Sequence, residues 1–337
     1  MVVFLYNVPE SNHISDNSTQ SDVFANFETE RSIAGLLDHF RRYVPDITGL
    51  NVNKPDWLDR LHGQKVFNYT YAFGLLSAST RPTFALESRR VDYIGAQPLG
   101  IYLSANKPHC SNLMAGLGFL CPQQHIICQP LSRIEAEYIS RMFGSIGHLV
   151  LKPAYEESSV GLALVQNSPD NIRWAVVDLY DRLPGVQILQ QYISGSDVTV
   201  PIIGRRSPHC LPAVVLSHEV TTIEPFVFDA KLKATKSALH YAPTSTWPDE
   251  LRAELYRIAE AAFRFTDQRD YSRVDCRVTP DGRCYFIEVN ANPQLGLGKA
   301  SFAVSAGVAG LEVGQVFRAI VQADTGEMGL SPMASGL

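Results

Sequence analysis

Two short segments in which polar and apolar residues alternate, joined by a polar turn, constrain the fold of this chain more than any other feature. The segments are 273–277 (RVDCR) and 288–290 (EVN), and the turn at 279–282 (TPDG) ends in glycine, as hairpin turns often do. Successive side chains of a strand point to opposite faces of a sheet. The polar residues of each segment therefore share one face, and the sequence predicts a β-hairpin here.

The polar face of this hairpin has the composition of a metal site. Asp275 and Glu288 supply carboxylates, and Asn290 supplies an amide. Arg273 belongs to the same face. Carboxylate and amide oxygens are the ligands that Mg2+ prefers, with substrate phosphates completing the coordination. A solvated hairpin face with cross-strand ion pairs would show the same alternation, so the hairpin alone leaves both interpretations open.

A second motif, at 149–162 (LVLKPAYEESSVGL), has the composition of a phosphate-binding loop. An apolar strand ends at Lys152, and a turn-rich loop with Ser158, Ser159 and Gly161 follows before the next strand. The ammonium group, the hydroxyls and the loop N–H groups can together surround phosphate oxygens. The glycine and lysine order of a P-loop is absent. Taken alone, the segment is better explained by a polar hairpin loop.

Together these segments resemble the ATP-grasp superfamily and, within it, the carboxylate–amine ligases similar to D-alanine–D-alanine ligase. The family pattern V-K-P-x-x-E-G-S-S-x-G is matched at 150–161, and its adenine hinge is matched at 190–200 (QQYISGSDVTV). Its metal hairpin is matched at 273–277 and 288–293, and a stretch at 93–107 resembles the one that ends in the first phosphate-contacting lysine. The motifs follow the family order from about residue 90 to 300.

The resemblance implies an α/β protein of the α+β ATP-grasp type, with three domains and the nucleotide between the central and C-terminal ones. We expect an N-terminal α/β domain at 1–105, a central subdomain at 106–185, a C-terminal subdomain with the metal site at 186–323, and a flexible tail at 324–337. The expected helices include 22–43, 107–116, 171–180, 248–265 and 310–323. The expected strands include 65–68, 91–95, 124–128, 149–153, 186–193, 197–203 and 211–216.

The resemblance also implies ATP as a substrate and assigns residues to it. The residues that match the phosphate contacts are Lys107, Lys152, Ser158 and Ser159, with the two serines closing as a lid. The residues that match the adenine hinge are Gln190, Gln191, Tyr192 and Ile193, acting mainly through their backbone. Asp197 stands where the family has an acidic acceptor for the ribose hydroxyls. Solvated lysines and an exposed strand are the alternatives.

For the chemistry, the resemblance implies an acyl phosphate that is made from ATP and a carboxylate and then attacked by an amine. Such a reaction requires charge neutralisation at the phosphoryl group. The residues that match the ligands of two Mg2+ ions, with Mn2+ as the alternative metal, are Asp275, Glu288 and Asn290. Arg273 would brace the acyl phosphate and the later oxyanion. Lys231 would reach over the γ-phosphate, although Leu232 follows it where the family has tyrosine.

The acceptor side departs from D-alanine–D-alanine ligase. Gln294 replaces a glycine, and Lys299 falls where the family has a serine that grips the second substrate's carboxylate. We therefore expect the substrate to contact Gln294, Lys299 and Ser301. An aromatic run at 67–74 (FNYTYAFG) replaces the family's H-G-x-x-G-E-D-G, which either core packing or a larger substrate pocket would explain. The acidic residues that could bind a substrate amine, or simply form a charged helix face, are Asp22, Glu28 and Glu30.

These departures predict an ATP-dependent ligase that joins amino-acid-like substrates in specialised, natural-product biosynthesis. One alternative is a D-alanine–D-alanine or D-alanine–D-lactate ligase of cell-wall synthesis. The other is an ATP-binding module that has lost catalysis, against which the intact metal residues argue.

The composition argues against several other functions. The net charge of −5 gives no electrostatic basis for binding nucleic acid or an acidic membrane. The apolar run at 2–6 is too short for a signal peptide, and no apolar stretch approaches membrane-spanning length. The six cysteines lack zinc-site spacing, which favours reduced, structural thiols. We expect a cytoplasmic homodimer that acts on small molecules.

Overall fold

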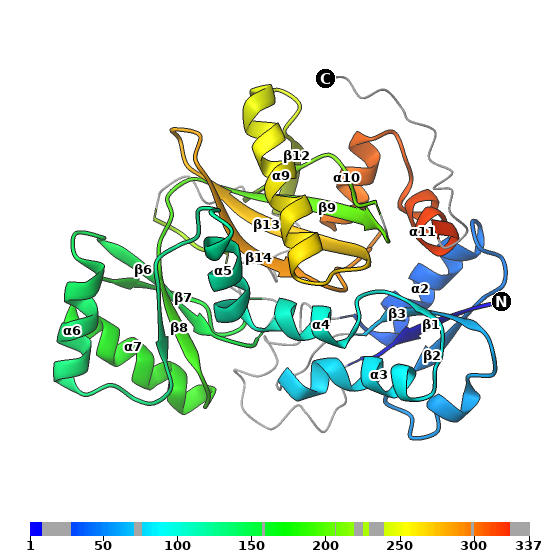
Figure 1. Cartoon of the computed structure of the whole chain (residues 1–337), viewed down its shortest axis with the longest axis horizontal. Coiled ribbons are helices and arrows are strands. Elements are labelled where there is room, and N and C mark those ends of the chain that lie inside the picture. Colours follow the sequence, from blue (N-terminus) through cyan, green and yellow to red (C-terminus); the bar gives the residue numbers. More distant parts are fainter. Residues whose placement is uncertain are drawn as a thin grey trace.

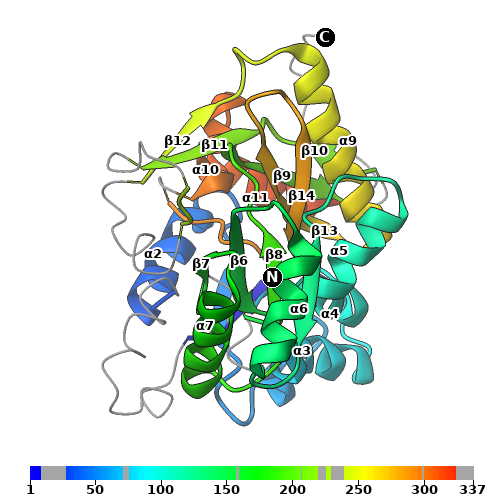
Figure 2. The same ribbon diagram turned by 90° about the vertical axis from the view of Figure 1, so that its left-hand side faces the viewer.

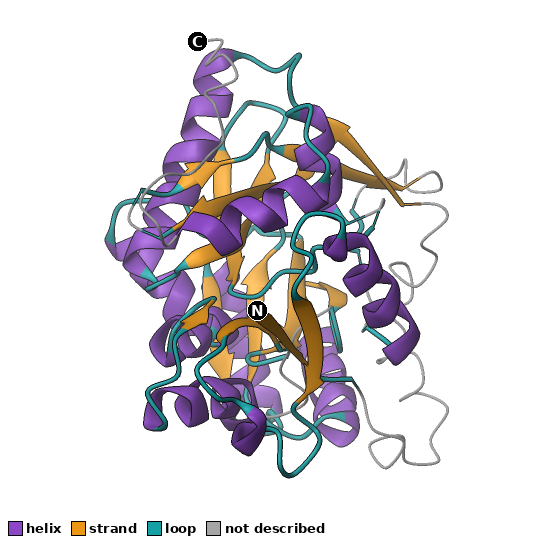
Figure 3. Cartoon of the chain, turned by 90° about the vertical axis from the view of Figure 1, so that its right-hand side faces the viewer, coloured by secondary structure: helices purple, strands orange, loops and turns teal. Residues whose placement is uncertain are grey.

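Three β-sheets organise the described part of the chain, one in each region that the sequence predicts as a domain (Figure 1). The structure is a computed structural model and describes residues 1–8, 28–70, 76–156, 159–205, 207–218, 225–228, 239–297 and 300–323. In Figure 3 the strands occupy the middle of the molecule and helices lie outside them. The predicted start of a helix at Asp22 and the predicted flexible tail at 324–337 lie outside the described residues.

The N-terminal sheet is parallel, in the order β2-β1-β3-β4. Its strands are β1 (Val2–Tyr6), β2 (Ile47–Asn51), β3 (Lys65–Tyr69) and β4 (Tyr93–Ile94). Helices α2 (Glu30–Arg41) and α3 (Leu76–Ser88) belong to this region, and a short 3-10 helix spans Leu58–Arg60. Helix α2 begins later than the sequence pattern predicts, because Thr29 and Ser32 form a capping box that fixes the helix start at Glu30.

The last helix of the chain completes the N-terminal core. Helix α11 (Val313–Gln322) places Phe317 against Phe40 of α2, with ring centroids 4.0 Å apart and planes parallel to within 1°. Phe317 also contacts Phe4 and Phe67 of the sheet. The boundaries predicted from sequence assign this helix to the C-terminal subdomain, but its apolar face is buried in the N-terminal core.

The central subdomain has an antiparallel sheet in the order β5-β8-β6-β7, with two helices packed together against it (Figure 2). Its elements are β5 (Gln124–Ile127), α6 (Arg133–Phe143), β6 (His148–Pro153), β7 (Ala163–Gln166), α7 (Pro169–Arg182) and β8 (Gln187–Gln191). The predicted boundary at residue 186 falls just before β8. β8 lies between β5 and β6, so the central sheet extends to residue 191.

The C-terminal sheet is antiparallel, in the order β12-β11-β9-β13-β14, with β10 paired to β9. Its strands are β9 (Ser196–Gly204), β10 (His209–Cys210), β11 (Val214–His218), β12 (Leu239–Pro243), β13 (Asp270–Val278) and β14 (Cys284–Asn290). Helices α9 (Asp249–Phe265) and α5 (Lys107–Gly116) pack against the same apolar core as this sheet, which Val200, Val274 and Phe286 help to form. The predicted boundaries place α5 in the central subdomain, yet it packs on β14.

Two further helices lie beside these sheets. They are α4 (Pro98–Ala105), just before α5, and α10 (Ser301–Val308), next to the C-terminal sheet. Within the described part of the chain, no single helix is both long and apolar enough to cross a membrane. Helices α10 and α11 meet the length and composition criteria only as a pair, bent by 95°.

The N-terminal and C-terminal sheets are joined through one buried carboxylate. Asp270 has a positive φ of 67° and accepts hydrogen bonds from Arg205 and from the backbone N–H of Gly95. Arg269 forms an ion pair with the same carboxylate and donates to the backbone of Tyr93. A left-handed non-glycine residue persists only where its surroundings hold it. These contacts therefore fix the position of β4 relative to β13.

We predict that Gly100→Ala destabilises the protein at the contact between α4 and the end of α9. A Cβ at Gly100 would lie 2.3 Å from the backbone oxygen of Asp267, so the backbone must move. The expected loss is about 1–3 kcal/mol of unfolding free energy, measured by urea denaturation. Gly307→Ala is the matched control, because no atom lies within 4 Å of its added Cβ. Equal stability of the two variants would contradict the packing described here.

Candidate active site

A cavity of about 660 Å³ is lined by all three regions of the chain. Lys152 and Gln190 line it from the central sheet, and Asp275 and Glu288 from the C-terminal sheet. Glu28, which lies just before α2, lines its far part. The volume lies in the range typical of small-molecule sites.

Strand register brings the hairpin residues together. Asp275 pairs directly with Glu288, and Arg273 pairs with Asn290, so all four side chains share one face of the β13–β14 hairpin. On the other side of β13, Thr199 of β9 pairs with Asp275. The strand register therefore confirms the expectation that the polar faces of the two strands coincide.

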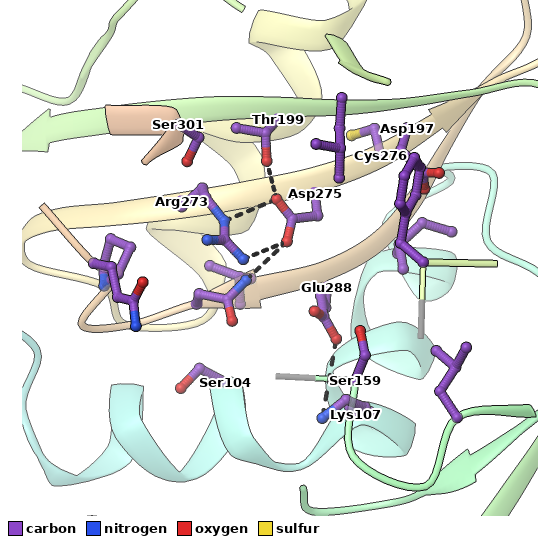
Figure 4. A pocket seen from close by; sticks show the side chains of 18 of the residues that line it. Ser104, Lys107, Ser159, Asp197, Thr199, Arg273, Asp275, Cys276, Glu288 and Ser301 are labelled. Atoms are coloured by element: carbon purple, nitrogen blue, oxygen red, sulfur yellow. Dashed lines mark hydrogen bonds and ion pairs between the residues drawn. The ribbon is translucent and has the colours of Figure 1, made fainter. Parts of the chain in front are cut away.

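The carboxylate of Asp275 accepts hydrogen bonds from three side chains of the cavity (Figure 4). Arg273 donates from Nε to Oδ1 at 2.9 Å and from Nη2 to Oδ2 at 2.8 Å. Asn290 donates from Nδ2 to Oδ2 at 3.0 Å, and the hydroxyl of Thr199 donates to Oδ1. Burial opposes the charge on Arg273, but the nearby carboxylates, Asp275 first, outweigh burial and raise the pKa of Arg273.

A bulge in β14 shapes this site. After the pair Asp275–Glu288, the next pair is Cys276–Phe286, so Ile287 is an extra residue in β14. Both Ile287 and Glu288 line the cavity, whereas Phe286 turns into the core under α9. Bulges commonly redirect side chains beside functional sites. Here the bulge lets the hairpin present a carboxylate to the cavity and keep an apolar core beneath it.

The predicted phosphate residues Lys107, Lys152 and Ser159 line the same cavity as the hairpin. Lys107, the first residue of α5, is buried; its Nζ lies 3.9 Å from Glu288 Oε2 and donates to the backbone oxygen of Glu156 (Figure 4). Lys152 is buried at the end of β6 and lines the cavity. Ser159 also lines the cavity and has a positive φ of 62°, a conformation that a non-glycine residue rarely adopts. Ser158 lies outside the described residues.

The predicted hinge residues line the cavity where the central and C-terminal sheets meet. They are Gln190, Gln191, Tyr192, Ile193 and Asp197. Gln190 is buried, and its Nε2 donates to Gln124 Oε1 at 3.1 Å, so this side chain belongs to a hydrogen-bonded network rather than to an exposed strand.

The predicted substrate residues are described only in part. Gln294 and Ser301 line the cavity, and Ser301 is the first residue of α10. At the same end, Glu28 accepts a hydrogen bond from the hydroxyl of Tyr69 at 3.2 Å. Lys299 and the loop lysine Lys231 lie outside the described residues, as do 71–75 of the aromatic run. Phe67 and Tyr69 of that run pack in the N-terminal core, as the packing interpretation expects.

Thr199, Arg277 and Tyr241 also line the cavity, and sequence reasoning assigned no role to them. The two-residue period of β13 places Arg277 on the same face as Asp275, and the period of β9 could have identified Thr199. Tyr241 of β12 also lines the cavity, and burial raises its pKa. Its strand follows a segment outside the described residues, and no motif marks it.

The six cysteines are all free in the structure. Burial raises the pKa of Cys110 to about 12 and that of Cys284 to about 11, so both remain protonated at neutral pH. No group of three or more His, Cys, Asp or Glu side chains positioned for a metal occurs among the described residues. The candidate cation site therefore rests on two carboxylates and an amide.

Comparisons with known proteins agree with this arrangement. The family model described as "D-ala D-ala ligase C-terminus" matches residues 127–322. A protein of Sinorhizobium fredii, y4sG, is 28% identical over 268 residues, which are 77% of this chain and 72% of that protein. A D-alanine–D-alanine ligase of Geobacter sulfurreducens is 30% identical over 209 residues, which are 62% of this chain and 61% of that ligase. The match thus spans less than two thirds of the ligase.

The fold is shared with solved ligases. The structure of D-alanine–D-alanine ligase from Bacillus anthracis complexed with ATP matches with a TM-score of 0.70 at 18% identity, covering 96% of this chain and 97% of that chain. The predicted ATP-grasp fold is therefore confirmed. Because the family model covers more than half of the 337 residues, the chain belongs to the D-alanine–D-alanine ligase family of ATP-grasp carboxylate–amine ligases.

Proposed function

We propose that this protein is an ATP-dependent ligase that joins the carboxylate of one amino-acid-like substrate to the amine of another through an acyl phosphate. The observation that best supports the proposal is the arrangement of charge around one cavity. Lys107 lies beside Glu288, Lys152 lines the same cavity from the central sheet, and Arg273 lies beside Asp275. Phosphoryl transfer depends mainly on this kind of electrostatic arrangement.

The hairpin residues fit a hard divalent cation such as Mg2+, with Mn2+ as the alternative. Asp275 and Glu288 lie side by side, and Asn290 donates through its Nδ2, so its carbonyl oxygen remains as the amide's acceptor. These three residues would hold the cation. A bound Mg2+ supplies neutralisation of the negative charge that moves between oxygens during phosphoryl transfer.

Each remaining polar group has a role that its position supports. Lys107 and Lys152 would bind phosphate oxygens, and Ser159 with its loop would exclude water from the acyl phosphate. Arg273 uses Nε and Nη2 to hold Asp275, so Nη1 is the nitrogen left to face a substrate oxygen. Glu28 would bind a substrate amine at the far end of the cavity.

Two candidate functions, which differ in their substrates, follow from different observations. The family match and the Geobacter relative favour a D-alanine–D-alanine ligase of cell-wall synthesis. Gln294 lines the cavity where D-alanine ligases have glycine, and Lys299 replaces their serine, which favours a different acceptor and a specialised biosynthetic role. The second candidate is the one we propose, because a changed acceptor contact alters substrate choice directly.

We predict that Glu288→Gln and Asp275→Asn each lower the rate of Mg2+-dependent ADP release by about 10²-fold or more. Each substitution removes a negative charge that would hold the cation, while leaving side-chain volume almost unchanged. Asp281→Asn, in the exposed turn of the same hairpin, is the control and should retain full activity. Near-normal rates in both site variants would eliminate the cation assignment.

We predict that Lys152→Ala raises the dissociation constant for ATP by about 10- to 100-fold, because a buried charge-assisted contact with phosphate is worth about 1.5–3 kcal/mol. Calorimetry with Mg2+ and a non-hydrolysable ATP analogue measures this directly. The exposed Lys54→Ala serves as the control for net charge. An unchanged affinity in Lys152→Ala would mean that the loop after β6 is only a turn.

We predict that D-alanine supplied alone gives little ADP release above background. A screen of amino-acid pairs should find a better pair, with a product whose mass equals the sum of the substrates minus water. With that pair, Lys299→Ala should raise the KM of the acceptor more than that of the donor. Efficient formation of D-alanyl-D-alanine would instead return the protein to cell-wall synthesis.

A further inference from the structure

We infer that Arg277 is a positioning residue of the nucleotide site, which fixes Asp197 so that the enzyme selects ribonucleotides over 2′-deoxyribonucleotides. The inference rests on the proposed ATP site and extends it to a side chain to which the resemblance gives no role. Arg277 lies on β13 two residues beyond Asp275 and faces the same cavity.

The sheet register places Arg277 opposite Asp197. The two residues pair directly across β13 and β9, just as Asp275 pairs with Thr199 one row further along. Rows two residues apart on one face are separated by roughly 6.5–7 Å. The sheet face therefore carries Asp275, a proposed cation ligand, in one row and the pair Arg277 and Asp197 in the next row. This spacing suits the phosphates and the ribose of one nucleotide.

One guanidinium holds three points of the hinge turn 192–197. Arg277 donates from Nη1 to Asp197 Oδ2 at 3.2 Å and from Nη2 to the backbone oxygen of Gly195 at 2.7 Å. Its Nη2 also donates to the hydroxyl of Tyr192 at 3.3 Å. A planar cation with five donors can serve several acceptors at fixed angles, which a lysine cannot.

The turn is pressed firmly against β13. Gly195 has a φ of 138°, and a Cβ there would lie 2.1 Å from the backbone oxygen of Val278. The Cζ of Arg277 lies 5.0 Å from the ring centroid of Tyr192 and 5.9 Å from that of Phe226. Phe226 in turn donates its backbone N–H to the Tyr192 hydroxyl at 3.2 Å. Arg277 therefore occupies the centre of a packed aromatic and polar cluster.

The exposed fractions of the Arg277 and Asp197 side chains differ, and this difference suggests a separate role for each. The Arg277 side chain is only 8% exposed, whereas that of Asp197 is 30% exposed and lines the cavity. A buried cation that holds one oxygen of a carboxylate limits the rotamers of that carboxylate. Asp197 is then oriented to accept hydroxyl hydrogens before the nucleotide arrives, which reduces the entropy lost on binding.

The test compares the affinities of ADP and 2′-deoxy-ADP in the presence of Mg2+ by calorimetry, which needs no amino-acid substrate. A hydrogen bond to a charged acceptor is worth about 1.5–3 kcal/mol, so the wild type should favour ADP about tenfold or more. Arg277→Met should reduce this ratio to about threefold or less, mainly through weaker ADP binding. Asp197→Asn should do the same. The double variant should show no further loss, because Arg277 acts through Asp197.

Arg283→Met is a matched control. Arg283 belongs to the same hairpin and also pairs with an aspartate and a tyrosine ring, but it is 58% exposed and does not line the cavity. The ratio of ADP affinity to 2′-deoxy-ADP affinity in Arg283→Met should equal that of the wild type. If Arg277→Met does not fold, Arg277→Lys decides, because it keeps the charge and loses the fork geometry; its ratio should fall between those of the wild type and Asp197→Asn.

Results that contradict the role of Arg277 can be distinguished from a result that contradicts the proposed function. A wild-type ratio in the Arg277 variants, or an equal loss of both nucleotides, would overturn the inference and leave Arg277 a merely structural residue. Equal binding of ADP and 2′-deoxy-ADP by the wild type would also overturn it while leaving the proposed ligase intact. Failure of the wild type to bind either nucleotide would overturn the proposed function as well.

Discussion

The pairing of β13 with a strand on each side is the constraint on which the site depends. Along its whole length β13 pairs with β9, and its partner on the other side is β14. One face of this triple strand packs under α9, and the other faces the cavity. A slip of one residue would turn every polar side chain into the core. Burial of Val274 and Cys276 thus fixes the register that brings Asp275 to Glu288.

The sequence could predict which side chains of the site share one face of a strand, because polar and apolar residues alternate within single strands. The two-residue period of 273–277 predicted the shared face, and the observed register agrees. What alternation could not supply was the bulge at Ile287, because Phe286 and Ile287 are both apolar and the sequence does not show which of them is the extra residue. Nor could it identify the third strand: Thr199 is 76 residues from Asp275, and only the sheet order brings them together.

Domain boundaries were the least predictable part of the fold. A linear division assumes that each unit is one continuous segment, but α5 packs on β14 and α11 packs on the N-terminal sheet. The amphipathic face of a helix shows that it must be covered, not which sheet will cover it. The start of α2 was also missed, because the capping box at Thr29 competes with the apolar pattern that precedes it.

The stacking of Phe317 on Phe40 has a consequence for how this protein is made. A chain emerges from the ribosome in order, and domains generally fold as units during synthesis. Here β1 to β4 are synthesised first, yet their apolar core remains open until α11 has been added more than 200 residues later. The first region to emerge is therefore the last to close, and its exposed phenylalanines must be kept from aggregation throughout translation.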